Sequence, residues 1–327
     1  MRPRNPNAEP KPFVWIPIPR ESPRRGQPTT HERFSGLTGK LELTFTVVSE
    51  YLFVGSGAYE FDPNHNNQRP DVWYTFYRRN GQICVPGTSI KGAIRAIVEA
   101  ISNSCISQFR RSREKVDKDH EPCRDQNKLC PACRLFGMTG LRGRVHFSDA
   151  FPEGQVRPQI VKIGELWEPR NYSGRKFYEV KRVPQLTDKR PQRNFRFVEA
   201  MSEGTCFRAT LHFENLSEAE LGLMAYALGW KTEKGTFDHA FTPKLGGAKP
   251  RCFGAVKFDP ARLTVWEVQK NGLLQLRMLE GDAVGAKLVR CMEAASRPET
   301  GLFHESSWRR LVEGYQEKTD TCPREMY

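Results

Sequence analysis

The sequence lacks the long apolar segments that mark membrane and secreted proteins. Its 327 residues contain no run of about 18 apolar residues, which excludes a membrane-spanning helix. The first residues contain no apolar stretch of the kind found in a secretory signal, so we expect a cytoplasmic protein. Nine cysteines without an export signal indicate free thiols or metal ligands rather than a disulfide framework.

Common catalytic motifs are missing as well. We find no GxSxG or HExxH motif and no spaced carboxylate cluster typical of a two-metal nuclease. A glycine-rich loop is present, but it does not match GxxxxGK[ST], so it does not indicate a nucleotide-hydrolysing P-loop.

Positive charge, in contrast, is in excess. Lys and Arg number 51 against 38 Asp and Glu, a net charge of +13, which favours a polyanionic partner. The excess lies in three segments: residues 1–33 carry +4, residues 104–144 carry +5 and residues 162–196 carry +6. We interpret the chain as a near-neutral core with three basic attachments.

Hydrophobic periodicity predicts an α+β fold. Alternating apolar residues predict strands near residues 41–47, 72–77, 144–149, 206–213 and 252–258. A helical period predicts helices that start near Thr88 or Ser89 and at Ser217, the second with a capping-box spacing to Glu220. The order of these elements is that of a ferredoxin-like α+β sandwich with insertions.

The chain divides into three parts by composition. We predict that residues 1–38 form an extended arm that docks through Phe13, Trp15 and Ile16. We predict that residues 39–265 form the core, with insertions at 105–135 and 155–197. We predict that residues 266–327 form a C-terminal extension with helices near 283–297 and 305–316.

One insertion contains closely spaced metal ligands. His120, Cys123, Cys130 and Cys133 form two chelating pairs, which predict a tetrahedral Zn²⁺ site. Four protein ligands leave no open position, so we expect the zinc to be structural. Cys105 is a possible substitute for His120, and incidental cysteines in a charged loop are the alternative. The remaining cysteines are expected to be ordinary thiols, and they are Cys84, Cys206, Cys252, Cys291 and Cys322.

Three segments are candidates for phosphate binding. The start of the helix near Ser89 combines a hydroxyl with Lys91 and Arg95, although an ordinary helix with surface basic residues fits equally. The glycine-rich loop offers close backbone approach at Gly246 and Gly247. Further basic candidates follow in that loop and in a basic, aromatic stretch at 162–196, and they are Lys249, Arg251, Lys181 and Arg182.

The aromatic residues of that stretch could stack on bases. They are Trp167, Tyr172, Phe177, Tyr178 and Phe195. A solvated charged loop is the alternative interpretation.

Three motifs, in order, carry a family resemblance. Val85-Pro-Gly-Thr-Ser-Ile-Lys-Gly-Ala-Ile-Arg resembles a "PGSSLKGxxR" helix start. Cys130-Pro-Ala-Cys-Arg-Leu-Phe-Gly, followed by Gly143-Arg-Val-His-Phe-Ser-Asp-Ala, resembles a "C..C.LFG…G.v.fsDa" stretch. The segment from Lys244 to Phe258 resembles a glycine-rich signature, with Arg251-Cys252-Phe253-Gly254 in place of R-G-x-G. Together they resemble the RAMP superfamily of CRISPR-associated proteins.

The closest resemblance is to the backbone subunit of type III effector complexes, including the III-D and III-E branches. It implies an RRM-like core that binds CRISPR guide RNA beside other effector subunits, with residues 155–197 as a β-hairpin thumb. It also implies Mg²⁺-dependent cleavage of target RNA by an aspartate after the first strand. Asp71 occupies that place, fifteen residues before Pro86, and Asp62 is the second candidate.

Two other functions remain open on this sequence. The chain could be a non-catalytic scaffold or capping subunit of the same complex, because some members of the family lack the aspartate. It could also be a standalone zinc-containing RNA-binding protein without CRISPR partners.

Overall fold

A five-strand path of antiparallel β-strands forms the centre of the fold. The computed structural model describes residues 11–63, 70–107, 116–166, 174–186, 188, 190–269 and 272–323. The strands lie in the order β10, β16, β2, β19, β20. Their bounds are β2 (Leu37–Val47), β10 (Val145–Phe147), β16 (Cys206–Leu216), β19 (Val256–Val268) and β20 (Leu274–Glu280).

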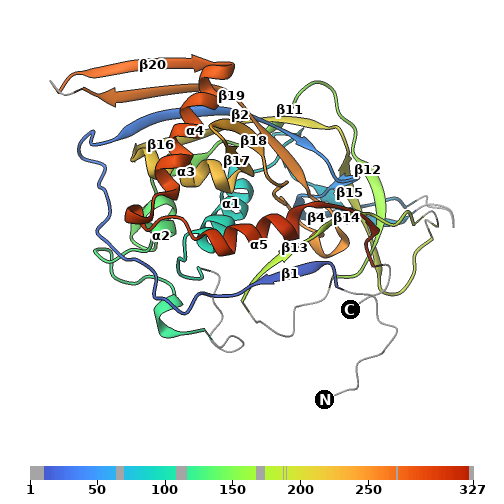
Figure 1. The fold of residues 1–327 in the computed structure, drawn as a ribbon. Coiled ribbons are helices and arrows are strands. Elements are labelled where there is room, and N and C mark those ends of the chain that lie inside the picture. The colour runs from blue at the N-terminus through green and yellow to red at the C-terminus, as the bar shows by residue number, and fades with distance from the viewer. Residues whose placement is uncertain are drawn as a thin grey trace.

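The topology confirms the ferredoxin-like fold class. Along the chain the core runs β2, α1 (Gly87–Ile101), β10, β16, α3 (Glu218–Ala227) and β19. In space the strands lie in the order β19, β2, β16, β10, with each neighbouring pair antiparallel. This is the arrangement of two interleaved βαβ units. The helices cover one side of the sheet, and β20 extends its edge (Figure 1).

Alternation along the strands places the apolar residues on the side of the helices. In β2 the buried residues include Leu41, Leu43 and Phe45, separated by polar neighbours. Phe45 stacks on Phe207, with 5.1 Å between the ring centroids, and lies 5.2 Å from Phe258. These rings come from three adjacent strands and pack against one another. Such aromatic pairs add stability beyond the apolar area that they bury.

A buried ion pair fixes α3 to the sheet. Arg144, 1% exposed, precedes β10 and donates to both carboxylate oxygens of Glu220 at 2.5 and 3.0 Å. It also donates to the carbonyl oxygen of Asn215 at 2.7 Å. Glu220 in turn completes the predicted capping box with Ser217 at the start of α3. This pairing satisfies a charge that would be costly to bury alone.

A second sheet flanks the first. Its strand order is β12, β15, β5, β4, and β3 also pairs with β15. The bounds are β3 (Tyr51–Leu52), β4 (Gly55–Phe61), β5 (Val72–Phe76), β12 (Gln159–Gly164) and β15 (Phe195–Ser202). The guanidinium of Arg78 forms a bidentate pair with Glu199, at 2.7 and 3.1 Å. That pair links β6 (Arg78–Arg79), which follows β5, to β15.

The segment predicted as a thumb is more complex than one hairpin. β12 and β15 form an antiparallel pair, and two short strands lie between them in the chain. β13 (Arg175–Tyr178) pairs with β1 (Phe13–Ile16) of the N-terminal arm. β14 (Val180–Arg182) pairs in parallel with β21 (Glu317–Thr321) near the C-terminus. Strands from the N-terminal and C-terminal parts of the described chain therefore both pair with this segment.

The remaining elements are short or lie at the periphery. The other strands are β6 (Arg78–Arg79), β7 (Gln82–Ile83), β8 (Gly137–Met138), β9 (Leu141–Arg142), β11 (Phe151–Pro152), β17 (Trp230–Glu233) and β18 (Thr236–His239). The other helices are α2 (Pro131–Phe136), α4 (Asp282–Ser296), α5 (Glu305–Tyr315) and the single-turn helices Lys118–His120, Lys249–Arg251 and Pro298–Thr300. Within the described ranges, no helix is long and apolar enough to cross a membrane.

Candidate functional site

Four cysteines lie close together beside α1 and α2. The sulfur atoms of Cys105, Cys123, Cys130 and Cys133 all lie within 4.8 Å of one another, and all four residues are buried. Cys105 Sγ is 3.5 Å from Cys133 Sγ and 3.6 Å from Cys130 Sγ. A tetrahedral zinc with bonds of about 2.3 Å would separate its sulfur ligands by about 3.8 Å. The cluster could therefore hold a metal ion.

The fourth cysteine corrects the predicted ligand set. His120 was expected to complete the site, but the structure brings Cys105 to the other three cysteines instead. His120 is buried nearby, and its Nε2 lies 2.9 Å from Asn103 Oδ1. Burial lowers the pKa of its imidazole, and the adjacent guanidinium of Arg175 acts in the same direction. His120 therefore belongs to the surroundings of the cluster.

Two arginines lie beside the sulfur atoms. Arg95 of α1 donates to Cys133 Sγ at 3.5 Å and to Glu99 Oε1 at 2.8 Å. Arg175 of β13 is 7% exposed and donates to the carbonyl oxygen of Ser104. Its Nε and Nη1 are buried without a hydrogen-bond partner among the described residues. Four thiolates around a divalent ion carry a net charge of −2, so the unpaired guanidinium fits an occupied site.

Hydrogen bonds among the four thiols shift their pKa values in opposite directions. They lower the pKa of Cys130 and lower that of Cys123 to about 7, whereas they raise the pKa values of Cys105 and Cys133. Metal ions bind the thiolate form, so a metal bound here would displace protons from Cys105 and Cys133.

The two candidate aspartates lie next to each other. They lie where the strands of the β4–β5 hairpin meet its connecting loop, and Asp62 N donates to Asp71 O at 2.9 Å. Both side chains are half-buried. The predictions of Asp71 and Asp62 therefore concern one location.

The same hairpin displays aromatic side chains that the sequence interpretation did not select. Tyr59, Phe61 and Tyr74 are 64%, 66% and 38% exposed. Tyr59 pairs with Tyr74 and Phe61 with Val72, so these residues share one face of the hairpin. The guanidinium of Arg196 lies 4.9 Å from the Tyr74 ring centroid. The alternation of Tyr59 and Phe61 was a signal that the sequence offered.

The start of α1 differs from the prediction. The helix begins at Gly87, and its first N–H donates at 2.8 Å to the carboxylate of Asp149, which also pairs with Arg79. The expected capping by Thr88 or Ser89 was wrong, and a protein carboxylate occupies the place proposed for phosphate. Ser89 is half-buried on the first turn.

The two basic residues of α1 have different environments. Lys91 forms no ion pair with a described residue, and burial lowers its pKa, as do the neighbouring charges of Arg95 and Arg142. Arg95 is held by Glu99, the Gly137 carbonyl oxygen and Cys133. Lys91 is therefore the better placed of the two to meet a phosphate.

The glycine-rich loop packs closely against the chain near β3. Gly247 N donates to Phe53 O at 2.7 Å, and a Cβ at Gly246 would lie 2.1 Å from that same oxygen. Gly246 also has φ +71°, a backbone conformation that favours glycine. These glycines serve internal packing, whatever else the loop contacts.

The cations in and beside this loop are largely buried. Arg251 donates to the carbonyl oxygens of Glu165 at 3.0 Å and Gly164 at 3.3 Å. Lys249 is half-buried, and burial lowers its pKa to about 8. Lys244 is 1% exposed with no partner for its Nζ among the described residues, and burial lowers its pKa to about 7.

The C-terminal segment covers the predicted thumb residues. Lys181 is buried and pairs with Asp320 at 2.6 Å and Glu179 at 3.2 Å, whereas Arg182 is exposed. The structure contains a disulfide between Cys252 and Cys322, which corrects the expectation that both are ordinary thiols. It ties the glycine-rich loop to the segment after β21.

The described aromatic residues that were predicted to stack on bases from the thumb are buried or half-buried. Phe177 is buried, and Tyr178 and Phe195 are half-buried. Trp167 and Tyr172 lie outside the described residues. Exposed aromatic rings are found on the β4–β5 hairpin instead.

Comparison with known proteins agrees with the fold. A search of curated proteins gives no match. Residues 44–257, more than half of the chain, match the RAMP superfamily. This range contains both ferredoxin-like helices, the four cysteines and the candidate aspartates. Proteins of this superfamily are CRISPR-associated and bind RNA, and the chain belongs to the RAMP superfamily.

Proposed function

We propose that the chain is a guide-RNA-binding backbone subunit of a type III effector complex that cleaves target RNA at the end of the β4–β5 hairpin. One observation carries the catalytic part. The two candidate aspartates are adjacent at the end of a hairpin whose aromatic residues are exposed to solvent. Unpaired RNA bases bind such surfaces, because each base can stack on an aromatic ring.

The aromatic face of the hairpin would position the RNA relative to the aspartates. Tyr59, Phe61 and Tyr74 point the same way from two paired strands. A base stacked there would leave its own backbone beside the turn that carries Asp62 and Asp71. Arg196 lies at the Tyr74 ring and pairs with Glu165, so it holds that ring in place.

The aspartates supply the chemistry. The 2′-hydroxyl of RNA can attack its own 3′-phosphate when the nucleotide is held in line. The bond to the 5′-oxygen of the next nucleotide breaks, that oxygen takes a proton from water, and a 2′,3′-cyclic phosphate is left. Orientation is the main requirement. Asp71 would orient that hydroxyl or accept its proton. The carboxylates of Asp71 and Asp62 are also the ligands that Mg²⁺ prefers, and the ion would neutralise charge on the phosphate.

We infer that the four-cysteine cluster binds structural Zn²⁺. Four thiolates in tetrahedral spacing suit zinc, and full coordination by the protein leaves no open position for catalysis. The ligands come from the segment after α1, the loop after the first single-turn helix and the start of α2. Zinc would therefore fix the segment 116–136 to the core.

We expect the guide RNA to bind basic side chains that form no ion pair within the described part of the protein. Lys91, Arg182 and Lys249 form no ion pair with described residues. Alanine at each should lower RNA affinity and reduce the salt slope by roughly one unit. Arg95, Lys181 and Arg251 bind protein groups, so their substitution would also disturb the fold.

Sequencing the RNA that co-purifies with the chain and its partners tests the guide-binding part. Processed CRISPR RNA is expected, and random cellular RNA would contradict the proposal. Cleavage of a complementary RNA then tests the aspartates. Asp71→Asn should bind target but lose cleavage at one position, and Asp62→Asn serves as the second candidate. Glu293→Gln, an exposed acid on α4, is the matched control. Unchanged cleavage in both aspartate variants would refute the site.

A further inference from the structure

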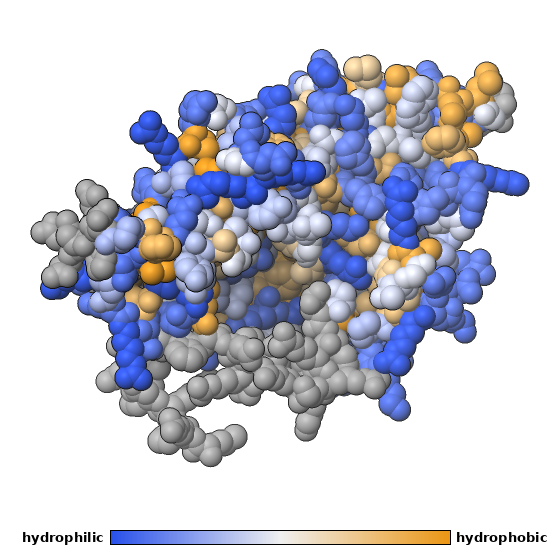
Figure 2. All heavy atoms as spheres, turned by 180° about the vertical axis from the view of Figure 1, so that it is seen from behind, coloured by the Kyte–Doolittle hydropathy of each residue, from blue (hydrophilic) through white to orange (hydrophobic). Residues whose placement is uncertain are grey.

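The β19–β20 hairpin carries its apolar side chains on the face turned away from the protein. Its large exposed apolar residues are Trp266, Val268, Leu273, Leu274, Leu276 and Met278, each between 40% and 65% exposed. Trp266 pairs with Leu276, and Val268 pairs with Leu274. Directly opposed residues share a face of a sheet, so the side chains of Trp266, Val268, Leu274, Leu276 and Met278 form one surface, which we name the hairpin patch. Figure 2 shows hydrophobic side chains gathered at this corner of the molecule.

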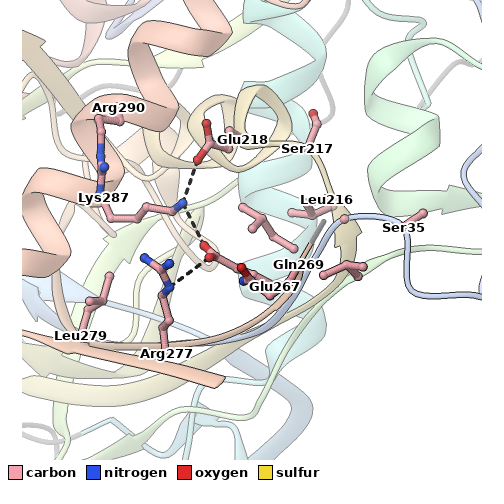
Figure 3. Close-up of a pocket in the computed structure, with 13 residues that line it drawn as sticks. Ser35, Leu216, Ser217, Glu218, Glu267, Gln269, Arg277, Leu279, Lys287 and Arg290 are labelled. Atoms are coloured by element: carbon pink, nitrogen blue, oxygen red, sulfur yellow. Dashed lines mark hydrogen bonds and ion pairs between the residues drawn. The ribbon is translucent and has the colours of Figure 1, made fainter. Parts of the chain in front are cut away.

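The opposite face of the hairpin is fixed to the protein by ion pairs. Lys287 of α4, 7% exposed, bridges Glu218 at 2.7 Å and Glu267 at 3.2 Å. Arg277 of β20 pairs with Glu267 at 3.1 Å. These side chains line a pocket between the hairpin and α4 (Figure 3). The polar face is thus turned inward, which holds the hairpin patch toward solvent.

The patch is large for a surface that stays in water. From the exposed fractions, its area is on the order of 500 Å², near the upper end of what monomeric proteins display. One side of a stable interface buries about 800 Å², of which somewhat more than half is apolar. The patch alone therefore supplies about the apolar area that one partner contributes to a standard interface.

We propose that the hairpin patch is the contact surface between two copies of this chain, packed face to face about a twofold axis. The patch contains no charged side chain, so it can oppose itself without repulsion. At one end it is bordered by Arg262 and Glu280, which pair across the strands and carry both signs of charge. A rim with both signs can complement its own twofold copy.

Other occupants fit the patch less well. RNA favours aromatic and basic surfaces, whereas this patch is mainly aliphatic with one tryptophan. The stretches of sequence outside the described residues are short, and each holds at most two large apolar side chains. None of them offers a comparable apolar face.

The test is the mass of the full chain in solution, freed of RNA by nuclease and high salt. Light scattering over a concentration series should show a dimer. Leu276→Lys and Met278→Lys should each raise the dissociation constant roughly 30-fold or more. Phe151→Lys, an apolar residue of β11 that is 38% exposed outside the patch, should have no effect. Because these side chains are exposed, thermal melting of the variants should match that of the parent protein at concentrations where the parent is monomeric.

A second readout needs no variant. Peroxide should oxidise Met278 more slowly at concentrations where the dimer forms than at concentrations where it does not. A monomer at every concentration would overturn the proposal, as would a dimer that neither lysine variant weakens. It would also be overturned if the isolated chain stays monomeric and a different effector subunit binds the patch.

Discussion

Removing Cys105 should release the metal, and removing His120 should not. The structure places Cys105 Sγ within 3.6 Å of two other cysteine sulfur atoms. His120 instead contacts Asn103. Cys105→Ser removes one of four ligands and leaves a smaller hydroxyl at the same place, so the change acts on coordination more than on packing.

The size of the effect follows from linkage between binding and folding. A ligand at 1,000 times its dissociation constant stabilises the folded state by about 4 kcal/mol. For a chain of this length, each kcal/mol shifts the melting temperature by roughly 2 °C. We therefore expect Cys105→Ser, or prolonged chelation of the unaltered protein, to lower the melting temperature by about 8 °C.

Metal content and thermal melting together measure this effect. Elemental analysis should find about one zinc per chain in the unaltered protein and in His120→Ala, and much less in Cys105→Ser. His120→Ala should have a somewhat lower melting temperature, because the substitution leaves a cavity. A chelator should lower the melting temperature of this variant further, as it does for the parent protein. Zinc retained by Cys105→Ser and lost from His120→Ala would refute the ligand assignment.

Three further predictions concern buried charges. Arg175→Gln should speed the loss of zinc to a chelating dye by about 10–100-fold, because a positive charge beside the thiolates is removed, and an unchanged rate would argue against that role. Burial lowers the pKa of Lys244 to about 7 in the folded protein, so the unfolded chain binds more protons above that pH. Urea unfolding should accordingly show stability rising by about 2–3 kcal/mol from pH 7 to pH 9, relative to Lys244→Met. Arg144→Met should cost about 3–5 kcal/mol, and adding Glu220→Leu should restore part of it, since the lone buried carboxylate is then gone; equal losses in the single and double variants would contradict this account.

Much of the core follows from local pattern. The alternation of Leu41, Leu43 and Phe45 predicts both the strand and its buried side. The spacing of Ser217 and Glu220 predicts the start of α3. These features depend on neighbours in sequence, so the sequence contains the information to find them.

The errors arise where the deciding partner is distant in sequence. Cys105 stands apart from the other three cysteines, and spacing favoured the nearer His120. Asp149 takes the first N–H of α1 from 62 residues away. The Cys252–Cys322 disulfide joins residues separated by 70 positions. Tertiary contacts of this kind leave no periodic signal.

The predicted RNA contacts show the same limit. A basic residue in the sequence looks available, but Arg251 is held by main-chain carbonyl groups and Lys181 by Asp320. Conversely, the exposure of Tyr59, Phe61 and Tyr74 depends on how the two strands of the hairpin sit in the second sheet. Availability is a property of the folded chain.

The most direct test of the proposed function is one cleavage assay on the assembled, guide-loaded complex. A labelled RNA complementary to the co-purified guide is incubated with Mg²⁺ and complexes that contain the unaltered chain or Asp71→Asn. We predict cleavage by the first and, at the position served by this subunit, none by the second, with equal target binding. Equal cleavage by both complexes would contradict the assignment of Asp71.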